Sequence, residues 1–125
     1  MDFELSDDQQ HLRDSVRSVL ERECPTALVR AAYDGRPEAA NGLWKVISDL
    51  DWPAIEVPES LGGLGMGFVE LALIAEETGR AVAPAPFMST VGQFVPMVLE
   101  TGSDEQKKAL LGPVLEAGST GALAI

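Results

Sequence analysis

The sequence holds few of the residues that most catalytic and metal sites use. Its 125 residues include one cysteine, Cys24, and one histidine, His11. One cysteine excludes an internal disulfide, and without a Cys/His cluster a zinc-type metal site has no support. One histidine without a G-x-S-x-G motif gives a serine-type catalytic triad no support either. The residues alone therefore predict no metal site and no catalytic residue, and we interpret His11 as a surface or boundary side chain.

Positive charge and long hydrophobic runs are also scarce. Nine Lys and Arg residues face twenty Asp and Glu residues, which gives a formal net charge of −11. This excess repels phosphates, so we expect neither nucleic acid nor an anionic membrane surface as a partner. No apolar run reaches the roughly 18 residues that membrane insertion needs, and the N-terminus is acidic where a signal peptide is basic. We therefore expect a cytoplasmic protein.

The residues that are abundant favour a helical core. Hydrophobic residues make up 46% of the chain and aromatics only 6%. The stretch 50–79 passes from a loop broken by Pro53 and Pro58, through clustered glycines, into a helix predicted over 68–78. That helix is apolar nearly all round, and a helix without a wide polar face must be surrounded by other helices. The rest of the chain is expected to cover it.

Apolar spacing and helix-start signals predict the covering elements. Ser6 with Gln9 forms a capping box at the start of a helix, and Ser103 with Gln106 forms another. We expect Pro96 to kink its helix near Gly92, and we expect Gly112 and Pro113 to end the short helix that Ser103 opens. The expected helices are 6–24, 26–33, about 37–50, 68–78, about 88–100 and 103–111, with one further turn at 114–117. The fold class is all-α: an orthogonal or up-down bundle of about six helices around 68–78, with the start of a β-strand at the C-terminal end.

Two features of the central stretch leave a chemical alternative open. The glycines read G-G-x-G-x-G, which fits neither G-x-G-x-x-G nor a P-loop, so a structural turn is favoured over a phosphate cradle. Glu70, on the otherwise apolar helix, is the best candidate for a general base. The favoured interpretation of Glu70 is still a solvated or salt-bridged carboxylate. The acidic pairs at 76–77 and 7–8 are interpreted as helix-surface charges.

Four motifs in order resemble one family. The run 52–65, WPAIEVPESLGGLG, resembles the P-E-x-x-G-G-x-G loop of the acyl-CoA dehydrogenases. The opening 5–9, the helix end 76–80 and the stretch 102–108 are similar to further motifs of that family. Together they cover the N-terminal helical domain of a much longer protein. We expect residues 1–121 to form that domain and residues 122–125 to be the first strand of a truncated middle β domain.

The resemblance implies an activity that this segment cannot carry out alone. The family binds FAD and oxidises acyl-CoA to 2-enoyl-CoA: a glutamate removes one proton, and the flavin accepts a hydride from the neighbouring carbon. That glutamate belongs to the family's C-terminal domain, so no residue here inherits the role. The implied partners are the acyl-CoA substrate, an electron-transfer flavoprotein or similar acceptor, and further subunits of a homo- or hetero-oligomer.

Two regions inherit a place near the site. Residues Leu123, Ala124 and Ile125 would begin the strand that passes the flavin, and they are the cofactor-binding candidates. The start of the fifth helix borders the acyl-chain cavity in this family, which makes substrate-pocket candidates of Ala85, Phe87, Met88, Ser89 and Gly92. Plain packing is the favoured alternative for these five residues. Two other functions stay open: a non-catalytic subunit related to the acyl-CoA dehydrogenases, and a stand-alone helical interaction module.

Overall fold

A computed structural model describes residues 3–124, and it confirms the all-α prediction. Short 3-10 turns connect the first helices, and a π-helix joins α5 to α6. The α-helices are α1 (Asp7–Glu23), α2 (Thr26–Tyr33), α3 (Asn41–Asp49), α4 (Phe68–Arg80), α5 (Phe87–Ser89), α6 (Val95–Thr101) and α7 (Asp104–Ala117). The 3-10 turns are Pro37–Ala40, Trp52–Ala54 and Glu59–Leu61, and the π-helix is Thr90–Phe94.

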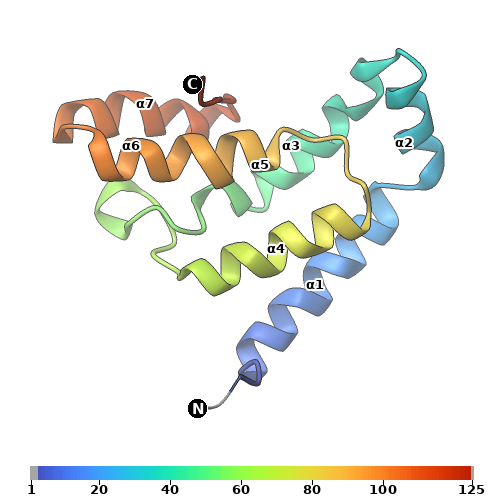
Figure 1. The fold of residues 1–125 in the computed structure, drawn as a ribbon, viewed down its shortest axis with the longest axis horizontal. Coiled ribbons are helices and arrows are strands. Elements are labelled where there is room, and N and C mark those ends of the chain that lie inside the picture. Colours follow the sequence, from blue (N-terminus) through green and yellow to red (C-terminus); the bar gives the residue numbers. More distant parts are fainter. Residues whose placement is uncertain (1–2, 125) are drawn as a thin grey trace.

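The helices form two connected parts (Figure 1). In one part α4 packs along α1, and in the other α6 lies beside α7. The run from α5 through the π-helix to α6 is continuous and links the two parts, while α2 stands at the far end. Both predicted capping boxes are present, with Ser6 Oγ accepting from Gln9 N at 3.2 Å and Ser103 Oγ accepting from Gln106 N at 3.2 Å.

The apolar core is divided in the same way. The larger cluster joins α1, α3, α4 and α5, and the smaller one lies between α6, α7 and the loop before α4. Each fully buried Leu, Ile or Phe contributes about 1.5–3 kcal/mol to folding. The larger cluster includes Val16, Leu20, Leu43, Ile47, Leu71, Ile74 and Phe87, and the smaller comprises Val57, Val95, Val98, Leu111 and Val114.

The central helix α4 is covered on one side only. Leu71, Leu73 and Ile74 are buried, as predicted, but Phe68 is 73% exposed and Val69 is 47% exposed. The expectation of cover on every side was therefore wrong for this chain. The helix also continues two residues beyond the predicted end, with Gly79 inside it rather than capping it.

The glycine-rich loop is a structural turn. Gly62 and Gly65 have positive φ values of 88° and 60°, which glycine adopts without strain. Gly63 approaches the Val57 backbone so closely that a Cβ would collide with the Val57 carbonyl. Three backbone bonds fasten the loop, from Leu64, Gly65 and Met66 to the carbonyls of residues 54, 57 and 55.

At three prolines the structure adds detail to the prediction or differs from it. Pro53 is buried in a 3-10 turn instead of an extended loop, because its fixed φ suits the first turn of a helix. Near Gly92 the chain widens into a π-helix, in which Val95 N–H bonds the Thr90 carbonyl five residues back. Pro96 follows directly in the first turn of α6, where the missing N–H of a proline is tolerated. Pro113 does not end α7; it is solvent-exposed, and buried Leu111 and Val114 on either side hold the helix together.

No strand is present in residues 3–124, and the expected strand start is not observed at 122–124. A strand needs a neighbour to pair its backbone groups, and this part of the chain offers none. Ile125 lies outside the described residues. No helix between residues 3 and 124 combines the length and apolar character needed to traverse a bilayer.

Candidate functional site

An apolar groove lies between α2 and the segment that leads from α4 into α5. Its volume is about 600 Å³, and no charged side chain lines it. A cavity of this size and lining suits the hydrophobic part of a small molecule. The lining includes Val29, Tyr33, Ala75, Thr78, Val82 and Pro84, together with three of the substrate-pocket candidates, Ala85, Phe87 and Met88.

The other two candidates lie outside the groove lining. Ser89 Oγ donates to the Pro86 carbonyl at 3.2 Å, inside its own turn. Gly92 lies beneath the Met88 side chain, where a Cβ would come within 2.8 Å of Met88 Cε. The structure therefore brings Ala85, Phe87 and Met88 together and places Ser89 and Gly92 further along the same helical run.

Val82 forms part of the groove wall in a strained backbone conformation. Its φ is 49°, in the left-handed region that β-branched residues avoid. Val82 N bonds the Gly79 carbonyl and Ala83 N bonds the Thr78 carbonyl, the Schellman pattern that usually has glycine at this position. The side chain is 68% exposed, so buried packing does not explain why valine stands here.

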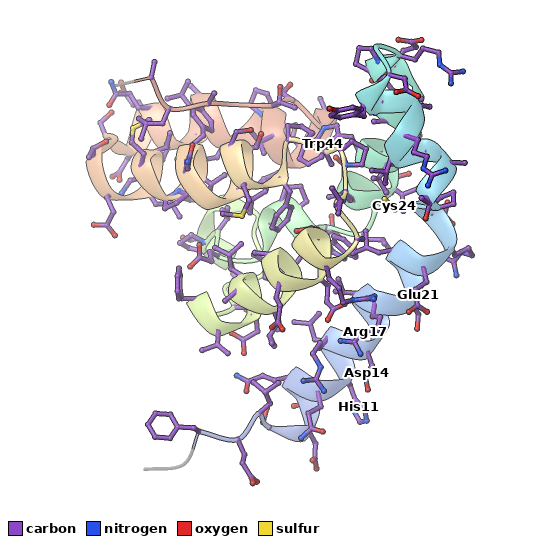
Figure 2. The ribbon with its side chains drawn as sticks, turned by 45° about the vertical axis from the view of Figure 1, so that its right-hand side comes forward. His11, Asp14, Arg17, Glu21, Cys24 and Trp44 are labelled. Atoms are coloured by element: carbon purple, nitrogen blue, oxygen red, sulfur yellow. The ribbon has the colours of Figure 1, made fainter. Side chains whose placement is uncertain are left out.

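The segment after α7 is fastened to the helices beneath it. Trp44 Nε1, from α3, donates to the Gly118 carbonyl at 2.7 Å (Figure 2). Thr90, in the π-helix, bonds both backbone groups of Gly121 at 3.1 and 3.2 Å. Leu123 is 41% exposed, and Ala124 is also exposed. The two predicted regions, the start of the fifth helix and the C-terminal segment, are thus held side by side.

A buried ionic cluster joins α1 to α4. Arg17 donates to both carboxylate oxygens of Glu77, at 3.0 and 2.7 Å, and Arg80 Nε donates to Glu77 Oε2 at 2.8 Å. The Glu77 side chain is 0% exposed. The Arg17 hydrogen bond, followed by that of Arg80, lowers the Glu77 pKa to about 2 against the cost of burial. Figure 2 shows Arg17 and Glu21, which reaches Arg80 at 3.5 Å, along α1.

The interpretation of Glu77 as a surface charge was therefore wrong. The sequence spacing indicated this burial, because Glu77 follows Leu73 by four residues and Ile74 by three, on the buried side of α4. Thr90 was missed as well. A threonine inside a helical run normally bonds a carbonyl of its own helix. Thr90 instead bonds the Gly121 backbone, which lies 31 residues further along the chain and is brought there only by the tertiary fold.

Glu70 is held in a way that does not suit a general base. Its Oε1 accepts from Gln9 Nε2 at 2.9 Å, and its Oε2 accepts from Gly67 N at 3.0 Å. The Gln9 bond is the main cause of a lowered Glu70 pKa, which keeps the group ionised and weakly basic. The carboxylate closes the start of α4, so it also occupies the place where a helix N-terminus would bind a phosphate.

Other reactive groups do not gather into a site. Among residues 3–124 no group of three His, Cys, Asp or Glu side chains is arranged to hold a metal ion. Burial raises the pKa of the Cys24 thiol, and its Sγ lies 3.8 Å from the Ala81 carbonyl. The thiol is therefore protonated and only weakly nucleophilic.

The described residues thus form an all-α domain with an apolar groove beside the start of α5. The model of the acyl-CoA dehydrogenase N-terminal domain matches residues 6–118. The chain therefore belongs to the acyl-CoA dehydrogenase family and corresponds to its N-terminal domain, as the motifs indicated.

Known proteins agree with this assignment. Acyl-CoA dehydrogenase FadE28 of Mycobacterium tuberculosis is 33% identical over 118 residues, which cover 94% of this chain and 30% of FadE28. An acyl-CoA dehydrogenase of Bacillus anthracis, solved in complex with FAD, has a TM-score of 0.76 and 30% identity, with coverage of 92% of this chain and 20% of that one. The Tcur3481-Tcur3483 steroid ACAD has a TM-score of 0.76 and 26% identity, with coverage of 96% and 32%. The chain thus spans about a third of the length of such relatives or less.

Proposed function

We propose that this chain is the N-terminal helical domain of a FAD-dependent dehydrogenase that oxidises an acyl-CoA to the 2-enoyl-CoA. The family match over residues 6–118 carries the proposal. The Bacillus anthracis relative in complex with FAD supports the flavin. In this proposal the catalytic base lies in another part of the protein. The buried Glu77 is kept ionised by two arginines, and Glu56, whose pKa burial raises, does not line the groove.

The groove is the part of this domain that suits the substrate. Its uncharged lining favours the acyl group over the phosphates of CoA. Met88 is 53% exposed at its edge, and a flexible thioether adapts to different apolar shapes. In this proposal Ala85, Phe87 and Met88 contact the acyl group, whereas Ser89 and Gly92 lie outside the groove lining and would act only through the helical run that carries Met88. The similarity to a steroid ACAD makes a bulky acyl group a substrate worth testing.

The C-terminal segment suits an edge contact with the flavin. Leu123 and Ala124 are apolar and exposed, as a residue beside a flat aromatic ring must be. The α4 N-terminus is closed by Glu70, so the phosphates of FAD would be bound by other residues of the protein. When bound, the flavin supplies the hydride acceptor of the reaction. Ile125 would extend the contact.

The remaining partners follow from the same proposal. An oxidised substrate leaves a reduced cofactor, which requires an acceptor such as an electron-transfer flavoprotein. The two-part name of the Tcur3481-Tcur3483 relative supports assembly into a homo- or hetero-oligomer. A cytoplasmic location is proposed on the acidic composition of the chain, with a formal net charge of −11.

The full-length protein tests the proposal directly. Purified protein should absorb at about 450 nm, as oxidised flavins do, and acyl-CoA added without oxygen should bleach that band. A protein with flavin but no bleaching by any acyl-CoA would overturn the dehydrogenase reaction. A protein without flavin would identify the non-catalytic subunit instead.

A further inference from the structure

One buried side chain fastens the segment after α7 to the helical run of the candidate pocket. Thr90 is 0% exposed. Its Oγ1 donates to the Gly121 carbonyl at 3.2 Å and accepts from Gly121 N–H at 3.1 Å. A hydroxyl can donate once and accept as well, so this one group satisfies both backbone groups of a residue that has no strand beside it.

The fit around Gly121 leaves little freedom. A Cβ on Gly121 would collide with the ring of Phe94. Thr90 and Phe94 are the first and last residues of the π-helix, which closes with the bond from Val95 N–H to the Thr90 carbonyl. The π-helix therefore presents a hydroxyl and a ring to the same glycine. Such turns often occur at functional sites.

We propose that Thr90 is a positioning residue for the cofactor contact: through Gly121, its hydroxyl sets where residues 122–124 lie against the flavin. The inference rests on the proposed function. Gly121 is two residues before Leu123, so a shift of its backbone moves Leu123 directly. Because Met88 and Ser89 immediately precede Thr90, the same helical run fixes the flavin contact and the pocket wall relative to each other.

The test compares three variants of the full-length protein. Thr90→Val keeps the shape and removes the hydroxyl, whereas Thr90→Ser keeps the hydroxyl. Val91→Ala is the structural control, because Val91 is equally buried, forms no contact with Gly121 that the proposal uses, and loses stability through a cavity. Each variant is measured for melting temperature, flavin dissociation constant, flavin absorption spectrum, and hydrogen exchange of the peptide that contains Gly121.

Thr90→Val should weaken flavin binding roughly tenfold, shift the flavin band and speed exchange at Gly121, because both backbone groups of the half-buried Gly121 lose their partner. Thr90→Ser should stay within about twofold of the wild type by the same reasoning. Val91→Ala should lower the melting temperature without changing the flavin band. Unchanged flavin binding and spectrum in Thr90→Val, or equal flavin loss in Val91→Ala, overturns the positioning role alone. A wild-type protein without flavin overturns the proposed function and this role together.

Discussion

Glu77 connects α4 to α1 through Arg17, and Arg80 of α4 bonds the same carboxylate. Its carboxylate is fully buried and accepts three hydrogen bonds, two from Arg17 and one from Arg80. A buried charge is tolerated only when paired in this way. Both arginines are partly exposed, with 41% and 44% of their side chains accessible, so water lowers the cost of the cluster. At the scale of the residue, pairing decides the charge state.

Replacing Glu77 with glutamine should destabilise the domain. Glu77→Gln keeps the volume but leaves two guanidinium groups facing a neutral amide, which should cost about 2–3 kcal/mol. Urea denaturation would measure this as a lower midpoint at an unchanged slope. Glu76→Gln is the matched control, because Glu76 is the exposed neighbour and should change stability little. Equal effects of the two variants would contradict a special role for Glu77.

Acid should weaken the same cluster. The Glu77 pKa of about 2 lies below its ordinary value of 4.5, so the folded state favours the ionised form. Its contribution is fully present above about pH 4.5 and is lost as the pH falls through about 2. As the pH is lowered from about 4.5 to about 2, we expect the free energy of unfolding to decrease. The decrease should be less steep in Glu77→Gln. Parallel pH profiles for the two proteins would contradict this account.

The domain should be less stable with valine at position 82 than with glycine there. The backbone is left-handed there, with a φ of 49°, which costs a non-glycine residue roughly 1–2 kcal/mol. Val82→Gly should therefore raise the melting temperature, despite the greater freedom of the unfolded chain. The control, Val69→Gly, places glycine inside α4 at another exposed valine and should lower it. If both variants lose stability alike, the strain at Val82 is negligible.

At the scale of the element, helix starts follow local rules and helix ends depend on their surroundings. The capping boxes at Ser6 and Ser103 begin α1 and α7 where the sequence predicts, because the pairing residues are three positions apart. Gly79 and Pro113 carry the usual signals of a helix end, yet α4 and α7 continue through them. Packing of the buried residues on either side outweighs those signals.

Pro113 should therefore lower the stability of α7 without ending the helix. Its ring removes one hydrogen bond to the Ala109 carbonyl, and both residues are exposed. Pro113→Ala should restore that bond and stabilise the domain by about 1–2 kcal/mol. A higher midpoint in thermal unfolding with unchanged helical circular dichroism would support this. A lower midpoint would show that the proline is needed to shape α7.

At the scale of the molecule, one face of the domain is apolar and uncovered. Phe68, Val69 and Met66 lie near the start of α4 and are 73%, 47% and 42% exposed. Such a face marks a surface that packs against another protein or binds a ligand, which suits a helical interaction module as well. It is consistent with a domain that packs against the rest of a dehydrogenase.

Residues 1–125 by themselves should show no dehydrogenase activity. The proposed function places the catalytic base and the residues that bind the FAD phosphates outside this segment, so acyl-CoA with an artificial acceptor should give no turnover. The isolated segment should also bind a hydrophobic dye and associate at high concentration, because its apolar face is open. Phe68→Ser with Val69→Ser should reduce the dye binding. Measurable turnover by the segment would contradict the division of labour proposed above.

The sequence by itself determined which segments are helical, where most helices start and which family motifs they carry. These properties depend on spacing within a few residues. Only the tertiary structure decided that Glu77 is buried between two arginines, that α4 keeps an open face, and that Thr90 binds Gly121. Each of these depends on side chains brought together from distant positions, such as Arg17 and Glu77, 60 residues apart. Patterns within a few residues do not show which distant side chain will make the contact.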